Sequence, residues 1–226
     1  MIQLNNLHKY YNKGKQNEIH VINGTTLSLP EQGFVCILGE SGSGKTTLLN
    51  TMGGLDDFKQ GSLSIAGETL HHYSSSRIDK IRTKHCAYIF QNYYLLQEHT
   101  VEYNIHLALD MYTLTEEEKQ ARIDYVLQAV DMQKYKKRVV SQLSGGQQQR
   151  IAIARALAKA PEVIFADEPT GNLDEANTMR IMQILKKVSK TCLVVMVTHE
   201  KRLASFFADR IIHITNGASA ILRFLL

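Results

Sequence analysis

The chain has few of the residues that mark linkers and disulfide frameworks. Only 3 prolines occur in 226 residues, which argues against long disordered linkers. The 3 cysteines, Cys36, Cys86 and Cys192, are an odd number without the spacing of a metal site, and two lie in apolar runs. We therefore expect buried thiols in a reducing compartment rather than disulfides.

Long apolar runs are also missing. No segment approaches the roughly 18 consecutive apolar residues of a membrane span. The first residues lack the basic start and apolar core of a signal peptide, so we expect none. If the protein serves a membrane, we expect it to do so through a partner.

The composition favours an ordinary globular protein. Apolar residues make up 44% and charged residues 21% of the chain, enough for the core of one α/β domain. The net charge of +4 suits phosphate ligands and the anionic inner face of a membrane, although a solvated surface with a slight excess of Lys is the better default explanation. This excess is too small to indicate nucleic acid, and we predict no nucleic-acid partner.

Strand patterns dominate the N-terminal part. Residues Ile2–Leu7 and Val21–Leu29 alternate or are rich in β-formers, and Asn23-Gly24 predicts a turn. Phe34–Leu38 is a continuous apolar run of strand length. Gly61–Ile65 predicts a further short strand.

The middle of the chain, from about residue 92 to residue 159, has mostly helical patterns. Thr100 and Thr115 are predicted N-caps, and Thr115 with Glu118 predicts a capping box. The basic run Lys134–Arg138 favours a solvated loop, with a binding patch as the alternative. The helix that is predicted to begin after Thr115 has one apolar face, formed by Ile123, Val126, Leu127 and Val130.

Buried-strand patterns return in the C-terminal part. Val163–Ala166 and Cys192–Val197 are apolar runs of the kind that a parallel sheet requires. Glu175–Ser189 between them predicts a helix. Residues 211–222 predict a closing hairpin with Asn216-Gly217 at its turn.

A glycine-rich segment connects the apolar run at residues 34–38 to a predicted helix. Gly39–Thr46 reads GESGSGKT and fits the pattern G-x-x-x-x-G-K-[ST]. The helix runs from about Lys45 to Met52 and ends at Gly53-Gly54. Backbone N–H groups of such a loop bind phosphates, Lys45 reaches the β- and γ-phosphates, and the Thr46 hydroxyl binds Mg²⁺. The strand–loop–helix order favours this site over a chance match.

Two carboxylates follow the apolar run that begins at Val163. Asp167 is placed to hold Mg²⁺ indirectly, as in P-loop enzymes generally. Glu168 is placed to accept a proton from an attacking water. Taken alone, the pair is better explained as a cap of the next helix, but together with a P-loop the catalytic interpretation is favoured.

A second helix start of the anion-binding kind occurs at Leu143–Arg150, which reads LSGGQQQR. A serine and two glycines precede the predicted helix Ile151–Lys159. One ATP does not need two such ends from the same chain, so this end is predicted to serve a nucleotide held by another subunit. Ser144 is also the predicted N-cap.

These ordered motifs resemble the ATP-binding-cassette (ABC) family from about Leu4 to Gly217. Gly39–Thr46 resembles the Walker A motif, Leu143–Gln147 the LSGGQ signature and Val163–Glu168 the Walker B motif with its catalytic glutamate. Over the rest of the chain, the family pattern is matched by Gln91 as the Q-loop glutamine, Asp174 in the D-loop and His199 as the switch histidine.

The aromatic residue that stacks on adenine in this family has two candidates. Tyr11 is favoured by its spacing from the preceding basic residue, Tyr10 is the competing choice, and core packing is the alternative for either. Glu40 stands where the family usually has proline, and Thr46 where it usually has serine. Neither change removes a required donor, but Glu40 adds a carboxylate that is expected to weaken binding slightly unless it points to solvent.

The resemblance implies a complete set of site residues. Catalytic roles are implied for Lys45, Gln91, Glu168 and His199, and magnesium contacts for Thr46, Gln91 and Asp167. Nucleotide contacts are implied for Tyr11, Gly39, Glu40, Ser41, Gly42, Ser43, Gly44, Lys45, Thr46, Thr47, Ser144, Gly145, Gly146, Gln147 and Asp174.

The resemblance also implies a fold and partners. We expect an α/β fold with a P-loop NTPase core, an N-terminal antiparallel β subdomain and an inserted α-helical subdomain. Residues 1–226 would be one domain, with residues 1–91 and 161–226 as the core and about 92–160 as the helical part. Two chains, identical or similar, would sandwich ATP and Mg²⁺ on the cytoplasmic face of the membrane. Membrane permease subunits, separate or fused to the chain, would complete the transporter.

The subfamily resemblance is to macrolide-export and lipoprotein-release systems. It depends on Ala166–Asp174, together with Leu48–Asn50 and Gly53–Asp56. It favours export or extraction. A groove near Gln91 to Glu98 would receive a helix of the membrane partner, through Tyr93, Tyr94, Leu95 and Leu96, with core packing as the alternative for half of them.

Two other function classes remain as alternatives. A non-transport ABC ATPase usually carries two cassettes or a long coiled coil, and this sequence has neither. A regulatory module that binds ATP without turnover is disfavoured by the presence of Glu168 and His199.

Overall fold

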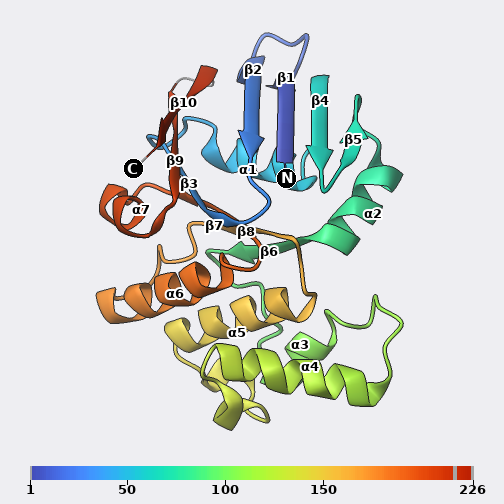
Figure 1. Cartoon of the computed structure of the whole chain (residues 1–226), viewed down its shortest axis with the longest axis vertical. Coiled ribbons are helices and arrows are strands. Elements are labelled where there is room, and N and C mark those ends of the chain that lie inside the picture. The colour runs from blue at the N-terminus through green and yellow to red at the C-terminus, as the bar shows by residue number, and fades with distance from the viewer. Residues whose placement is uncertain (1, 216–217, 225–226) are drawn as a thin grey trace.

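One sheet organises the part of the chain that the computed structural model describes, residues 2–215 and 218–224. Its strands lie in the order β5-β4-β1-β2-β10-β9-β3-β8-β7-β6 (Figure 1). The strands are β1 (Ile2–Tyr11), β2 (Ile19–Leu29), β3 (Gly33–Leu38), β4 (Gln60–Ile65), β5 (Glu68–Leu70), β6 (Cys86–Phe90), β7 (Val163–Asp167), β8 (Leu193–Thr198), β9 (Arg210–Thr215) and β10 (Ala218–Phe224).

The parallel half of the sheet consists of β6, β7, β8, β3 and β9. All six residues of β8 are buried, and so are residues 34–38 of β3, because helices or other strands cover both faces. This burial explains the continuous apolar runs in the sequence. Leu38 pairs with Thr198, and Asp167 pairs with Val197, so three strands end at one edge of the sheet.

The antiparallel half is formed by β1, β2, β4 and β5, where burial alternates along the strands. The predicted turn at Asn23-Gly24 is wrong, because both residues lie inside β2 and the connection from β1 spans residues 12–18. Gly24 has φ 65°, and a Cβ there would lie 3.2 Å from Asn6 Oδ1. The glycine therefore accommodates an irregularity in the pairing of β1 with β2 and does not reverse the direction of the chain.

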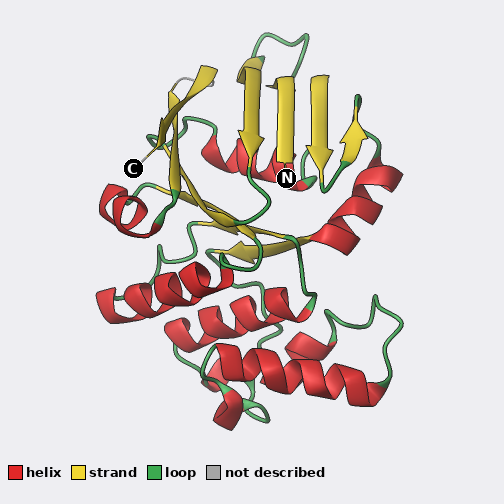
Figure 2. Cartoon of the chain, in the orientation of Figure 1, coloured by secondary structure: helices red, strands yellow, loops and turns green. Residues whose placement is uncertain are grey.

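Helices occupy the connections between strands (Figure 2). The predicted N-caps Thr100 and Thr115 are confirmed, and Thr115 forms the expected capping box with Glu118. The helices are α1 (Lys45–Gly53), α2 (Ser75–His85), α3 (Val101–His106), α4 (Glu116–Ala129), α5 (Gly145–Ala158), α6 (Glu175–Val188) and α7 (Lys201–Phe207), with 3₁₀ turns η1 (Gln133–Tyr135) and η2 (Val140–Gln142).

Helix α2 was not predicted from the sequence. It is strongly polar and buries chiefly Ile78, Ile81 and His85 of its 11 residues, which is too few apolar positions for a clear helical period. Helix α5 begins at Gly145, six residues before the predicted start, because its cap is Ser144. The strands of the predicted closing hairpin are confirmed by antiparallel β9 and β10, while Asn216-Gly217 lies outside the described residues.

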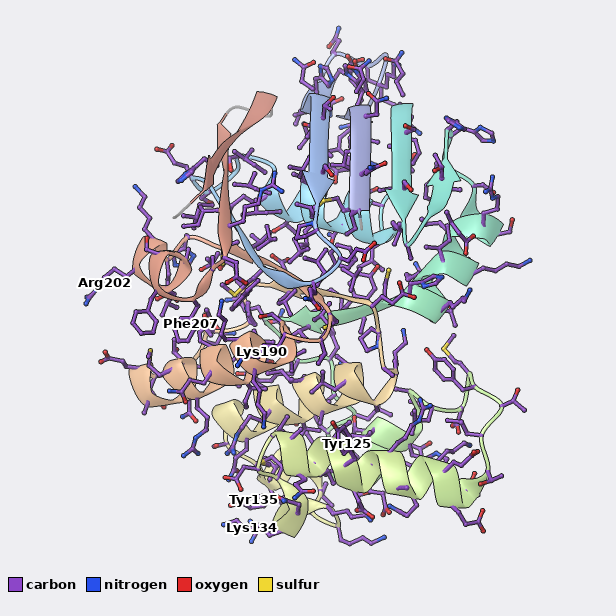
Figure 3. The ribbon with its side chains drawn as sticks, viewed as in Figure 1. Tyr125, Lys134, Tyr135, Lys190, Arg202 and Phe207 are labelled. Atoms are coloured by element: carbon purple, nitrogen blue, oxygen red, sulfur yellow. The ribbon has the colours of Figure 1, made fainter. Side chains whose placement is uncertain are left out.

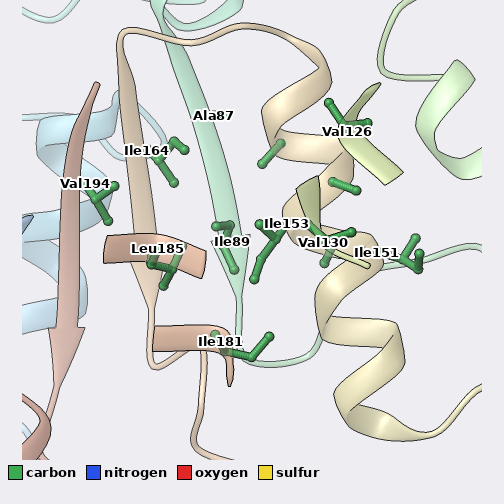
Figure 4. Close-up of a cluster of buried hydrophobic side chains, with 14 of the residues drawn as sticks. Ala87, Ile89, Val126, Val130, Ile151, Ile153, Ile164, Ile181, Leu185 and Val194 are labelled. Atoms are coloured by element: carbon green, nitrogen blue, oxygen red, sulfur yellow. The ribbon is translucent and has the colours of Figure 1, made fainter. Parts of the chain in front are cut away.

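Two apolar cores lie on the two faces of the sheet. The first core contains α1, which lies between the parallel half and the antiparallel half of the sheet (Figure 1). On the other face α5 and α6 pack against the parallel strands. Figure 4 shows this second core, in which Ala87, Ile89, Ile164 and Val194 of the strands meet Ile153, Ile181 and Leu185 of the helices.

The three cysteines are buried and free, as predicted. Burial raises the pKa of the Cys36 and Cys86 thiols to about 12 and that of Cys192 to about 11. In the described residues, no helix combines the length and the hydropathy that crossing a bilayer requires.

The basic run Lys134–Arg138 lies at the end of the molecule remote from the antiparallel strands, where Figure 3 shows Lys134 and Tyr135. Lys136 pairs with Asp124 at 2.5 Å, and Lys137 pairs with Glu102. Lys134 lies over the Tyr135 ring, 5.2 Å from its centroid. These local pairings support the prediction of a solvated surface segment.

Shortening a core side chain is expected to destabilise the fold measurably. Ile164→Ala should lower the free energy of unfolding by about 2–5 kcal/mol, because Ile164 is 0% exposed and its loss leaves a cavity between sheet and helices. Met111→Ala, at a residue that is 63% exposed, should change it by less than about 0.5 kcal/mol. Urea denaturation measures both, and equal losses would contradict this description of the core.

Candidate functional site

A cavity of about 770 Å³ opens beside the edge where the parallel strands end. It joins the loop after β3 to the residues that follow β7 and β8. Its lining residues are Ile19, Val21, Ser41, Gly42, Gly44, Lys45, Thr46, Thr47, Glu168 and His199. The structure therefore brings most of the predicted phosphate-binding loop together with Glu168 and His199, which lie far away in the sequence.

The loop at residues 39–46 has the backbone that its glycines predict. Gly42 and Gly44 have φ values of 78° and 91°, a region that favours glycine. A Cβ at Gly44 would also lie 3.0 Å from Val21 Cγ1. The loop leads directly into α1, whose N-terminus favours anions.

Two polar groups of this loop are suited to a phosphate ligand. Lys45 Nζ donates to the Glu40 carbonyl oxygen at 2.6 Å, which keeps the ammonium within the loop. Ser43 Oγ is buried without a hydrogen-bond partner. The Glu40 side chain is exposed, which is the condition under which its carboxylate was expected not to weaken binding.

The predicted metal ligands Thr46 and Asp167 are in direct contact. Thr46 Oγ1 donates to Asp167 Oδ1 at 3.0 Å across the gap between α1 and the end of β7. Burial raises the pKa of Asp167, the charge of Glu168 adds to the rise, and the hydrogen bond from Thr46 opposes it. A hydroxyl and a carboxylate oxygen are ligands that Mg²⁺ prefers, so this pair fits that ion.

Glu168 and His199 form a second contact. His199 Nδ1 lies 3.2 Å from Glu168 Oε1, and the two follow the adjacent strands β7 and β8. Glu168 has φ 43°, a left-handed conformation that is uncommon for this residue type, and its N–H donates to the Val197 carbonyl at 3.0 Å. Such strained positions occur often at functional sites.

Other predicted residues lie outside the cavity. Gln91, directly after β6, donates from Nε2 to Asn172 Oδ1 at 3.2 Å. Asp174 caps α6 and accepts from the Asn177 N–H at 2.8 Å, and hydrogen bonds from Asn177 hold the pKa of Asp174 below its usual range. The cavity lining includes neither Gln91 nor Asp174.

The signature residues also lie outside the cavity, at the start of α5. Ser144 accepts from the Gln147 N–H, and Gln147 Oε1 accepts from the Ser144 N–H, so a capping box begins the helix. A Cβ at Gly146 would lie 2.4 Å from the Asn177 side chain, and one at Gly145 would lie 3.1 Å from the Tyr93 hydroxyl. In this chain, then, Ser144–Gln147 and the cavity are separate.

The two tyrosine candidates have different surroundings. Tyr11 donates to Asp56 Oδ2 at 2.7 Å and lies 3.5 Å from Thr47 Oγ1, next to α1. Tyr10 instead stacks on His20, with centroids 3.9 Å apart. Neither tyrosine is among the residues that line the cavity, so the choice of Tyr11 stays a prediction.

Two lining residues were missed by the sequence analysis. Ile19 and Val21 lie on β2, and Ile19 is 57% exposed. The sequence offers no clear signal for these two residues, because nothing in it shows that β2 passes beside residues 41–47.

The expected docking residues divide into two pairs. Tyr94 and Leu96 are 64% and 42% exposed. Leu95 is buried, and Tyr93 packs against the core, which agrees with the core-packing alternative for half of the set.

Comparison with known proteins decides the family. Residues 22–171 match the family model described as ABC transporter. This chain belongs to the ABC transporter family. It is an ATP-binding ATPase domain of that family, with the α/β fold of its cassettes.

Curated relatives are longer than this chain. The macrolide export ATP-binding/permease protein MacB of Mannheimia succiniciproducens is 37% identical over 96% of this chain and 34% of its own length. A putative ABC transporter ATP-binding protein of Mycoplasma genitalium is 39% identical over 96% of this chain and 46% of its own length. The chain thus spans less than half of the length of these relatives.

A solved structure matches the whole chain. It is a dimeric ATP-binding cassette in a post-hydrolysis state bound to ADP and phosphate. The TM-score is 0.89 at 36% identity, and the match covers 100% of this chain and 99% of the other. The arrangement of strands and helices around the cavity is therefore that of an ABC cassette.

The raised pKa of Asp167 predicts a stability cost. Burial makes the ionised carboxylate of Asp167 less favourable in the folded chain than in the unfolded chain. This cost is present above the folded-state pKa and is lost as the pH falls from there to the ordinary pKa of aspartate. Without nucleotide, Asp167→Asn should raise the thermal midpoint at pH 7.5 by about 2 °C. The gain should vanish in acid.

Asp209→Asn is the matched control, and its expected change in thermal midpoint has the opposite sign. Burial acts to raise the pKa of Asp209, but hydrogen bonds from Lys186 and the Phe34 N–H hold it below its usual range. Asp209→Asn should therefore lower the midpoint at pH 7.5, and calorimetry at several pH values compares the two. A lower midpoint for Asp167→Asn would show that the Asp167 charge does not oppose folding.

Proposed function

We propose that this chain binds Mg-ATP between its own cavity and the signature surface of a second such subunit. The observation that supports this best is the separation of Ser144–Gln147 from the cavity within one chain. A helix N-terminus with a serine cap and two glycines is an anion site, and here the cavity of its own chain does not include it. A facing subunit would supply the missing phosphate.

In this proposal, the loop at residues 39–46 holds the phosphates. Its N–H groups surround them, and the unpartnered Ser43 hydroxyl donates to a phosphate oxygen. Lys45 exchanges the Glu40 carbonyl for the β- and γ-phosphates, and Thr47 adds its hydroxyl. Tyr11 packs on the adenine.

Magnesium would be held by Thr46, Asp167 and Gln91. The existing contact between Thr46 and Asp167 would open to admit the ion, with Asp167 acting through water. When bound, the ion neutralises charge on the β- and γ-phosphates. Gln91 would have to give up Asn172 to take part.

Hydrolysis would be carried out by Glu168 and His199. The carboxylate orients the attacking water and accepts its proton, while His199 holds the γ-phosphate. Their 3.2 Å contact brings both groups to one side of the cavity. Ser144, Gly145, Gly146, Gln147 and Asp174 of the second subunit would close the other side.

The second subunit is proposed to be a copy of this chain or a similar ATPase. A dimer is reported for the cassette that matches with a TM-score of 0.89. Loss of the γ-phosphate would weaken the contacts across the pair, so that binding closes the dimer and hydrolysis opens it.

We further propose that the dimer powers export or extraction through membrane permease subunits at the cytoplasmic face. The relative from Mannheimia succiniciproducens is named as an ATP-binding/permease protein and continues well beyond the length of this chain. Tyr94 and Leu96 offer an exposed contact for such a partner. Residues 1–91 and 161–226 would form the nucleotide-binding core and residues 92–160 the helical subdomain, with no role for nucleic acid.

Glu168→Gln separates hydrolysis from binding. The variant should retain ATP binding, lose at least about 100-fold in kcat because no carboxylate accepts the proton, and accumulate as an ATP-bound dimer. Phosphate release and size-exclusion chromatography with light scattering measure these effects. Glu117→Gln, on an exposed position of α4, is the control for charge and should behave as the unsubstituted chain. ATP binding without any turnover by the unsubstituted chain would instead favour a regulatory module.

Removal of magnesium tests the metal assignment. EDTA should reduce phosphate release to background while leaving weak ATP binding, and Mg²⁺ should restore turnover. Asp167→Asn should require at least about tenfold more Mg²⁺ for half-maximal turnover, because the water-mediated carboxylate contact is lost. An unchanged Mg²⁺ requirement would exclude Asp167 from the metal site.

A further inference from the structure

Two consecutive residues after Gln91 have left-handed backbones. Tyr93 has φ 59° and Tyr94 has φ 47°, and neither is glycine. L-residues with side chains adopt this region rarely, and two in succession require contacts that hold them there. The Tyr94 N–H donates to the Asn92 carbonyl at 2.6 Å, which closes a tight turn.

Arg155 on α5 supplies the missing contacts. Its guanidinium donates to the Tyr93 carbonyl at 2.7 Å and to the Tyr94 carbonyl through its other terminal nitrogen. The Arg155 side chain is partly buried, and this burial lowers the pKa of its guanidinium. A fork that bonds two adjacent carbonyl groups holds the backbone more firmly than single donors can.

The side chain of Tyr93 reaches the start of α5. A Cβ at Gly145 would lie 3.1 Å from the Tyr93 hydroxyl, so the phenol abuts the first turn of the helix. Farther along α5, Gln149 donates to the Pro169 carbonyl at 2.6 Å, directly after Glu168. One helix thus contacts both the segment around Gln91 and the segment around Glu168.

We propose that Arg155 is a positioning residue for both halves of the composite site. It fixes the Tyr93–Tyr94 backbone, and this holds the position of Gln91, two residues earlier in the chain, after the end of β6. Through the Tyr93 phenol it also supports Gly145, which faces the nucleotide of the other subunit. The inference rests on the proposed roles of Gln91 and the signature residues, but the restraint on Tyr93–Tyr94 can be measured independently of them.

The first experiment measures the restraint. The chain has no tryptophan, so Tyr94→Trp places a single fluorophore on an exposed ring. In that background Arg155→Met should lower the tryptophan anisotropy of the full chain, and Arg155→Lys should lower it less, because one donor remains. Lys159→Met is the matched control. Lys159 is the C-cap residue of α5 and donates to a β6 carbonyl, that of Cys86, at 2.7 Å, and its loss should leave the anisotropy unchanged.

The second experiment measures the consequence for turnover. At a temperature where all variants are folded, Arg155→Met should lower kcat for Mg-ATP about tenfold and leave KM within about twofold, because Arg155 positions Gln91 without touching nucleotide. Arg155→Lys should recover part of kcat, which also serves if Arg155→Met does not fold. Lys159→Met should keep both constants within about twofold.

The results separate the inference from the proposed function. Equal anisotropy in all variants, or equal losses of kcat in Arg155→Met and Lys159→Met, would overturn the positioning role. Absence of turnover in the unsubstituted chain would contradict the proposed function, and the anisotropy would then still decide whether Arg155 restrains the turn.

Discussion

The arrangement depends on the buried register between the parallel strands β3, β8 and β7. Leu38 pairs with Thr198 and Asp167 with Val197, so the chain leaves three neighbouring strands at one edge. The phosphate-binding loop, Glu168 and His199 meet there although they lie far apart in the sequence. A shift of one residue would turn each strand's side chains to the opposite face, and the apolar cores on both faces oppose this.

The site combines stability costs with the features needed for nucleotide chemistry. Asp167 is held with a raised pKa, Glu168 with a left-handed backbone and Ser43 with an unpartnered hydroxyl. Each is unfavourable in the free chain, and in the proposed function each would be relieved or used when nucleotide and Mg²⁺ bind. The rigid sheet beneath them makes such costs tolerable, because its core restrains the ends of the strands.

Helix α5 connects the two faces of the proposed composite site. It begins at the signature residues. Its buried Gln149 donates to the Pro169 carbonyl next to Glu168, and its partly buried Arg155 donates to the Tyr93 carbonyl two residues after Gln91. In the proposed dimer, α5 would therefore link the two nucleotide sites. The exposed Tyr94 and Leu96 belong to the segment that Arg155 contacts, so a membrane partner bound there would lie next to this helix.

The sequence by itself determined the local features whose cause is local. The glycine-rich loop, the caps at Thr115 and Ser144 and the apolar runs of β3 and β8 depend on near neighbours in the chain, and each was predicted. Tertiary structure decided what depends on distant segments. Asn23-Gly24 became part of β2 because that strand pairs with β1 on both sides of it, and polar α2 is a helix because its few apolar residues are buried in the core. The hydrogen bond from Arg155 to Tyr93 could not be predicted from the sequence, because every residue has a main-chain carbonyl group and the residue type therefore does not indicate which one accepts.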